Sequence, residues 1–294
     1  MASRRRCATV GWQGDLRRSR KPAIAGQAAG PQRRYAFGDS GLAARRLALL
    51  HEVYAPSSSA LLADAVTRSP ALAYDLGCGP GYTTDMVAQV TAARRTIGLD
   101  SSASFVAAAT ARHEEAPTGG RPEFTAHDVL ALPFPAGPAE LIYCRLLLAH
   151  LTDPADAVVR WASQLTDDGM VVVDEIEWIE TSHPLLRAHL RLADLMVAAS
   201  GARMYAGPLL ASLSDHRGLR TRFTRVTEVP VPTATAAQLF GMNLAATGDR
   251  PVMLALCSAS ELAGLRSGLA DLTASTATGQ IKWGMRQAAY SHSR

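Results

Sequence analysis

The chain has 294 residues, 48% of them hydrophobic, and can bury one full α/β core with an appended subdomain. The formal net charge is +4, but residues 1–34 hold nine basic residues and one acid and contribute +8, which leaves −4 for the remainder. No apolar run reaches the length of about 18 residues that a membrane span requires. We therefore expect no membrane partner, and no nucleic-acid partner, because phosphate binding needs a basic face on the folded domain.

Residues 1–34 are rich in Arg, Ala and Gly and show no sustained apolar periodicity, so we expect a disordered basic tail. They contain no apolar segment typical of a secretion signal, and we expect a cytoplasmic protein. The four cysteines, Cys7, Cys78, Cys144 and Cys257, are scattered without metal-ligand spacing. This pattern indicates a reducing compartment and no bound metal.

The first ordered element is predicted to be an amphipathic helix over residues 38–56, with a cap at Asp39 or Ser40 and Pro56 at its end. Its apolar stripe consists of Leu42, Leu47, Leu50 and Val53. This helix lies before the first core strand.

Three glycines, Gly77, Gly79 and Gly81, separate an apolar strand at residues 71–74 from a helix predicted at 82–93. Glycine serves where the chain turns tightly or lets a ligand approach the backbone. Such a turn aims free N–H groups and the positive end of a helix at a phosphate or carboxylate. A dinucleotide loop would have glycine in place of Tyr82, and a phosphate-binding Walker loop would need a lysine that no nearby position supplies.

The pattern Asp75-x-Gly77-x-Gly79-x-Gly81 resembles the first motif of class I S-adenosylmethionine-dependent methyltransferases. The resemblance covers roughly residues 70–178. It implies an α/β Rossmann-like fold with a seven-stranded sheet, mostly parallel with the last strand antiparallel. It also implies S-adenosyl-L-methionine as the cofactor, S-adenosyl-L-homocysteine as its product, and no metal.

Later strands end at residues that the resemblance assigns to this cofactor. The run at 96–100 ends in Asp100, at the interval after the glycines where an acid meets ribose hydroxyls. A third strand within 122–134 ends in Asp128, implied to contact the adenine amino group, and the exit of a fourth strand within 139–151 faces the methionine part. In related enzymes an aromatic residue placed like Tyr35 often flanks the sulfonium. The implied cofactor-binding residues are Tyr35, Asp75, Gly77, Cys78, Gly79, Asp100, Ser101, Asp128, Val129, Cys144 and Arg145.

The second half predicts a helical cap on this core. A fifth strand is expected at 168–177, followed by an antiparallel pair at 221–231 and 279–290. Helices are predicted at 183–200, 233–247 and 258–272, and Ser258 with Glu261 forms a capping box. The expected units are a basic tail (1–34), lid helices (35–69), the cofactor-binding core (70–182), a cap insertion (183–220), a core strand (221–232), cap helices (233–278) and a last strand with the C-terminus (279–294).

The cap is where the acceptor should be chosen. Candidates for an apolar pocket, most of which would serve equally as ordinary core, are Trp178, Met196, Met204, Tyr205, Phe240 and Met242. The arrangement resembles small-molecule tailoring methyltransferases of bacterial natural-product pathways. We expect a monomer or homodimer that methylates a small aromatic or hydrophobic molecule on O, N or C, an indole carbon included. The Asp/Asn-Pro-Pro-aromatic motif of nucleic-acid adenine methylation is absent, because Tyr143-Cys144-Arg145 stands there.

The candidate catalytic residues are Glu175, Glu177 and His150. Two neighbouring carboxylates at a strand end can raise each other's pKa and leave one as a base, or they can be a solvated strand end. A neutral His150, about one turn past the fourth strand, is a second candidate proton acceptor. The alternative functions are a catalytically inactive cofactor-binding partner or regulatory subunit, and an enzyme that uses the cofactor for other chemistry.

Overall fold

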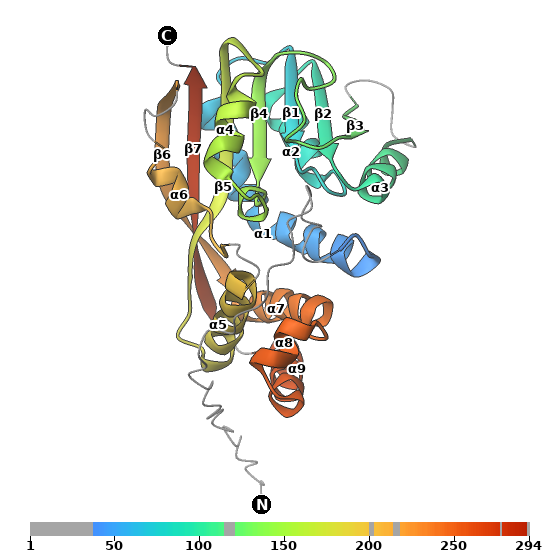
Figure 1. The fold of residues 1–294 in the computed structure, drawn as a ribbon, viewed down its shortest axis with the longest axis vertical. Coiled ribbons are helices and arrows are strands. Elements are labelled where there is room, and N and C mark those ends of the chain that lie inside the picture. Colours follow the sequence, from blue (N-terminus) through green and yellow to red (C-terminus); the bar gives the residue numbers. More distant parts are fainter. Residues whose placement is uncertain (1–37, 115–120, 200–202, 214–217, 277, 293–294) are drawn as a thin grey trace, which may run out of the picture.

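The computed structural model describes residues 38–114, 121–199, 203–213, 218–276 and 278–292 (Figure 1). The predicted tail and Tyr35 lie outside the described residues. The predicted division into units therefore remains a prediction for the N-terminal segment.

The centre of the fold is a seven-stranded sheet in the order β3-β2-β1-β4-β5-β7-β6. The first five strands pair in parallel, and β7 runs antiparallel to both β5 and β6. The strands are β1 (Leu72–Leu76), β2 (Arg95–Asp100), β3 (Glu123–Ala126), β4 (Ala139–Arg145), β5 (Leu165–Glu180), β6 (Leu219–Pro232) and β7 (Gln280–His292). This topology is that of the Rossmann-like methyltransferases and confirms the predicted fold class.

Helices cover both faces of the sheet, as parallel strands require for their crossovers. On one face α4 (Pro154–Ala162) buries Trp161 against strand residues that include Tyr74 and Ile142. On the other face α1 (Gly41–Ala65) and α2 (Tyr82–Thr91) pack on Ala73 and Tyr143. Neighbouring residues of one strand thus belong to different cores, because side chains alternate across a sheet. The third helix of this half, α3 (Ala103–Glu114), lies beside β2 and β3.

The first helix differs from its prediction, because α1 continues through Pro56 to Ala65. Proline inside a helix removes one backbone hydrogen bond. The helix continues because Leu61 and Leu62, both fully buried, pack on the sheet beyond that point. Tertiary packing therefore outweighs the local stop signal, and one long helix spans the sheet and the cap.

The cap consists of α5 (Pro184–Ala199), α7 (Thr233–Thr247), α8 (Pro251–Leu256) and α9 (Ala259–Thr273). In Figure 1 these helices form a separate layer beside the distal parts of β5, β6 and β7, and α1 lies between this layer and the sheet. Their apolar side chains form one core with Leu50 and Tyr54 of α1. The predicted capping box of Ser258 and Glu261 is confirmed at the start of α9. Two short helices, α6 (Gly207–Ala211) and η1 (Leu148–His150), complete the described elements.

None of the helices in the described ranges combines the length and apolar character that a membrane crossing would require.

The junction of β5 and β7 predicts a matched pair of glycine variants. A Cβ added at Gly284 of β7 would lie 2.6 Å from Nε1 of Trp178, so Gly284→Ala forces the indole to move. We expect it to lower the free energy of unfolding by about 1–3 kcal/mol. Gly264 of α9 is exposed and has nothing within 4 Å of such a Cβ, so Gly264→Ala should raise that free energy by up to about 1 kcal/mol. Urea unfolding of both variants checks the opposite signs, and equal shifts would contradict the packing argument.

Candidate functional site

The glycine loop after β1 has the backbone that only glycine adopts readily. Gly77, Gly79 and Gly81 have φ angles of 66°, 52° and 86°, in the left-handed region. A Cβ at Gly77 would also lie 2.8 Å from Cδ1 of Leu147. The loop is fixed to β2, because the N–H groups of Gly77 and Cys78 both donate to the carbonyl of Leu99 (2.8 and 3.1 Å).

Asp100, the last residue of β2, lies beside this loop and accepts two backbone hydrogen bonds. Its Oδ2 accepts from Gly79 N–H (2.8 Å), and its Oδ1 accepts from Ser102 N–H (2.8 Å). Burial raises the pKa of Asp100, and the two backbone bonds oppose that shift. Each oxygen keeps a second lone pair, so the carboxylate is oriented and can still accept hydroxyl donors.

Asp75 orients the helix that follows the loop. Its Oδ2 accepts hydrogen bonds from the hydroxyls of Thr83 (2.6 Å) and Thr84 (2.7 Å) in the first turn of α2. The side chain is buried, and desolvation raises its pKa to about 6 against the effect of the two threonines. Asp75 therefore holds the N-terminus of α2 next to the end of β1, with the glycine loop between them.

The start of α1 closes over this edge of the sheet. The carboxylate of Asp39 accepts from the hydroxyls of Ser102 (3.1 Å) and Ser104 (2.7 Å), which follow β2. Leu47 lies over the loop, 3.3 Å from the place where a Cβ of Gly79 would be. The start of α1 and the residues just before it therefore lie against the glycine loop and the end of β2.

The exit of β4 carries Arg145, which joins the sheet to α1. Its guanidinium donates to Ser58 Oγ (3.2 Å) and faces His51 Nδ1 (3.2 Å), and it lies 5.9 Å from the ring centre of Tyr54. Burial, and next the charge of Arg145, lower the pKa of His51 to about 4. Ser58 Oγ in turn donates to Asp174 Oδ2 (2.6 Å), at the parallel position of β5. Sequence spacing did not identify His51, Tyr54 or Ser58, because α1 meets these strand ends only in the folded chain.

Glu175 faces the opposite side of β5 from Asp174, as strand alternation predicts. It is 1% exposed, and its Oε1 accepts hydrogen bonds from the N–H groups of Leu147 and Leu148 (both 2.7 Å). Desolvation raises its pKa to about 8, with a smaller contribution from Asp174. The prediction that Glu175 and Glu177 raise each other's pKa is therefore wrong for Glu175. Burial and Asp174 raise the pKa of Glu175 instead. Glu175 holds the loop that leaves β4.

Glu177 and His150 have different surroundings. Glu177 forms a two-pronged ion pair with Arg286, at 2.7 and 2.9 Å, and both side chains are mostly buried. It is thus not a solvated strand end. His150 ends the short helix η1 after β4, and burial together with Arg46 lowers its pKa to about 4. At neutral pH its imidazole is therefore uncharged.

The other residues assigned to the cofactor lie around the same edge. His127 N–H donates to the carbonyl of Asp100 (2.9 Å), which brings the following Asp128 and Val129 next to the end of β2. Ser101 is exposed directly after β2. Burial raises the pKa of the thiols of Cys78 and Cys144, so neither is activated as a nucleophile.

A row of aromatic rings leads from Arg145 into the cap. Tyr54 of α1 lies 5.4 Å from Trp283 of β7, ring centre to ring centre; Trp283 is parallel to Phe240 at 6.3 Å, and Phe240 stacks on His189 at 4.4 Å. All four residues are at most 4% exposed. Among the described residues, Tyr54 Oη, Trp283 Nε1 and His189 Nδ1 are buried without a hydrogen-bond partner.

The structure brings only part of the predicted cap pocket into this core. Met196 and Phe240 belong to it. Trp178, Met204, Tyr205 and Met242 are partly buried. In the described ranges no group of three or more His, Cys, Asp or Glu side chains is arranged to hold a metal ion.

Residues 73–169 match the family described as a methyltransferase domain. Over 137 residues the chain is 34% identical to trans-aconitate 2-methyltransferase of Streptomyces avermitilis, an alignment that covers 44% of this chain and 51% of that protein. Over 219 residues it is 28% identical to the Yersinia pseudotuberculosis protein of the same name. This alignment covers 71% of this chain and 80% of that protein. The chain thus spans about half the length of the Streptomyces relative, and 52% of a Methylobacterium radiotolerans one.

Two solved structures share the fold. The YcgJ protein of Bacillus subtilis superposes with a TM-score of 0.55 at 17% identity, covering 81% of this chain and 99% of that one. The [4+2]-cyclase SpnF superposes with a TM-score of 0.52 at 20% identity, covering 80% of each chain.

The residues at the sheet edge fit S-adenosylmethionine. The ribose needs an acceptor for two neighbouring hydroxyls, and Asp100 offers two oriented oxygens beside a loop in which three of five residues are glycine. Arg145, at the exit of β4, would lie near the methionine part. When bound, the cofactor supplies an electrophilic methyl group, and the protein has to align the acceptor with it.

We predict that Asp100→Ala weakens binding of S-adenosylhomocysteine by roughly 10- to 150-fold, because it removes a charged acceptor worth about 1.5–3 kcal/mol. Calorimetry measures the dissociation constant directly.

The matched control is Asp64→Ala on α1, which loses an exposed ion pair with Arg225 and should leave the affinity unchanged. Equal affinity of wild type and Asp100→Ala for S-adenosylhomocysteine would show that Asp100 does not bind the ribose.

Proposed function

We propose that this chain, whose core is a class I S-adenosylmethionine-dependent methyltransferase domain, transfers a methyl group from S-adenosylmethionine to a small-molecule acceptor. The main support is the carboxylate of Asp100, whose two oxygens are oriented by Gly79 and Ser102 beside the glycine loop. The glycine loop lets the cofactor approach the main chain closely, and Asp100 binds its ribose. The protein then contributes mainly alignment and exclusion of water, which can be worth roughly 7–11 kcal/mol.

The acceptor in this proposal is an aromatic or hydrophobic molecule that also carries oxygen atoms. The aromatic row of Tyr54, Trp283 and Phe240 supports the first property. The unpartnered Nε1 of Trp283 and Oη of Tyr54 support the second, because a buried donor without a partner costs about 1–3 kcal/mol. The indole N–H can only donate, so its partner must be an oxygen or nitrogen acceptor. Relatives named for trans-aconitate fit this chemistry, since that acid presents carboxylate oxygens.

Bacterial natural-product biosynthesis is the proposed setting. The support is an Ala- and Arg-rich composition and the presence of a helical cap. A cytoplasmic location and a monomeric or homodimeric state belong to the same proposal.

Among the three candidate catalytic residues, the contacts favour different roles. Glu175 is buried and bound to the backbone of the β4 exit, which favours positioning of that loop. Glu177 is compensated by Arg286, which favours orientation over proton transfer. His150 is uncharged at neutral pH and can accept a proton where the acceptor must lose one, but its pKa of about 4 makes it a weak base.

A catalytically inactive cofactor-binding partner is the alternative. A third possibility is other chemistry on the same fold, because the structurally similar SpnF is a [4+2]-cyclase.

The test is mass spectrometry after incubation with methyl-labelled cofactor and a panel of phenols, indoles, amines and small carboxylic acids. We expect one or more products that carry the labelled methyl group. Trp283→Phe should lower kcat/KM for oxygen-bearing acceptors more than for those without oxygen, because it removes the indole donor. Cofactor binding without any methylated product would favour the inactive partner.

The pH dependence of a single turnover separates the candidate bases. With His150 as base, the rate should be flat from pH 6 to 9, because its pKa of about 4 leaves the imidazole deprotonated throughout. His150→Gln should lower this rate by roughly 100- to 10,000-fold while cofactor affinity stays the same.

With Glu175 as base, the rate should instead rise as pH passes about 8, where its carboxyl group loses the proton. A rise of this kind that disappears in Glu175→Gln would transfer the role from His150 to Glu175. Unchanged rates in His150→Gln, Glu175→Gln and Glu177→Gln would leave alignment alone as the mechanism.

A further inference from the structure

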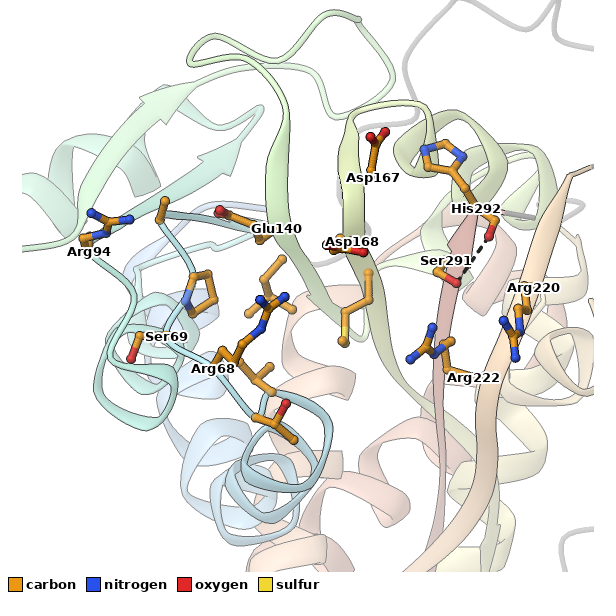
Figure 2. Close-up of a pocket in the computed structure, with 17 residues that line it drawn as sticks. Arg68, Ser69, Arg94, Glu140, Asp167, Asp168, Arg220, Arg222, Ser291 and His292 are labelled. Carbon is orange, nitrogen blue, oxygen red and sulfur yellow. Dashed lines mark hydrogen bonds between the residues drawn. The ribbon is translucent and has the colours of Figure 1, made fainter. Parts of the chain in front are cut away.

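A cavity of about 660 Å³ lies at the edge of the sheet opposite the glycine loop (Figure 2). It is formed by the segment 66–71 before β1, the first residues of β4 and β5, and the neighbouring parts of β6 and β7. These are the amino ends of the parallel strands, whereas Asp100 and Arg145 lie at their carboxyl ends. A strand of five to seven residues separates the two edges by roughly 17–23 Å. The volume falls in the range of small-molecule sites, about 300–1,000 Å³.

Four arginines line this cavity: Arg68, Arg94, Arg220 and Arg222. Within the described ranges none of their guanidinium groups has a hydrogen-bond or ion-pair partner. Other arginines of the same sheet are paired, for example Arg95 with Glu123, and Arg225 of β6 with Asp64. Unpaired cations are thus gathered around one concave site.

The backbone of β6 directs two of these arginines to the site. Arg220 and Arg222 are two residues apart and both line the cavity. The pairing of β6 with β7 shifts register between Thr221 and Phe223, so Arg222 is the extra residue of a β-bulge. Bulges re-aim side chains. Figure 2 shows Arg220 and Arg222 close to Ser291, while Arg68 enters from the segment before β1.

Acidic residues limit what can bind. Glu140, Asp167 and Asp168 also line the cavity, and Glu140 Oε2 accepts a hydrogen bond from Leu72 N–H (2.9 Å). These carboxylates would repel a long polyanion that extends across the cavity. A compact anion can contact the arginines without lying next to the carboxylates. Guanidinium groups present paired donors that match the oxygens of a phosphate.

We propose that this cavity binds a small molecule through a phosphate or diphosphate group, at a site separate from the methyl-transfer edge. Arg220 and Arg222 hold the anionic group, and Arg68 approaches it from the other wall. The carboxylate of Asp167 lies on the side of the uncharged or hydroxyl-bearing remainder of the ligand. The inference depends on the cavity alone, so it stands whether or not the chain proves to transfer methyl groups.

Calorimetry of the full chain with inorganic pyrophosphate, in chloride buffer of low ionic strength, tests the proposal. We expect saturable binding of one pyrophosphate per chain. The double variant Arg220→Gln/Arg222→Gln should weaken it by roughly tenfold or more, because two charge-assisted contacts are lost. The control Arg225→Gln lies on the same strand but is paired with Asp64, and it should bind within twofold of wild type.

Circular dichroism confirms that each variant is folded, and the single variant Arg222→Gln replaces the double one if that does not fold. Absence of saturable binding, or equal binding in wild type and the Arg222 variants, overturns the proposal. A single-stranded DNA oligonucleotide that binds more tightly than pyrophosphate, and depends on the same arginines, would assign the site to a polyanion instead.

Discussion

Buried carboxylates at the carboxyl ends of the parallel strands hold this site together. Each binds a segment next to a strand end: Asp75 holds the start of α2, Asp100 holds Gly79 and Ser102, Asp174 holds α1 through Ser58, and Glu175 holds the exit of β4. Burial raises the pKa of all four. The stability that each contributes is therefore complete below its ordinary pKa and lost as pH rises through the raised value. At neutral pH the chain thus gives up stability to keep these loops in place.

The parts of the site that could be predicted from the sequence are those whose residues lie close together in the chain. Gly77, Gly79 and Asp100 follow from the spacing of glycines and of a strand end, because both the loop and the acid belong to consecutive βα units. Tyr54 and Trp283 could not be found in this way, since 229 positions separate them and only the closure of α1 and β7 around the cap brings their rings together.

The length of α1 shows why the lid was predicted too short. Pro56 is a valid local stop, but the helix beyond it is held by sheet contacts of Leu61 and Leu62 that no local pattern records. Because the helix is continuous, its first turns at Asp39 and Leu47 cover the glycine loop, and its middle at Tyr54 enters the cap core. One helix thus joins the glycine loop to the core of the cap.

The two edges of the sheet differ in how their charges are balanced. At the carboxyl edge nearly every charged group has a partner: Arg145 with Ser58 and His51, Glu177 with Arg286, and Asp39 with Ser102. At the amino edge Arg68, Arg220 and Arg222 remain unpaired among the described residues although the chain after residue 34 is acidic overall. Glu140, Asp167 and Asp168 line the same cavity, yet in the described part of the chain the guanidinium groups of these arginines form no ion pair with them. The proposed anion would supply the partner that the fold does not.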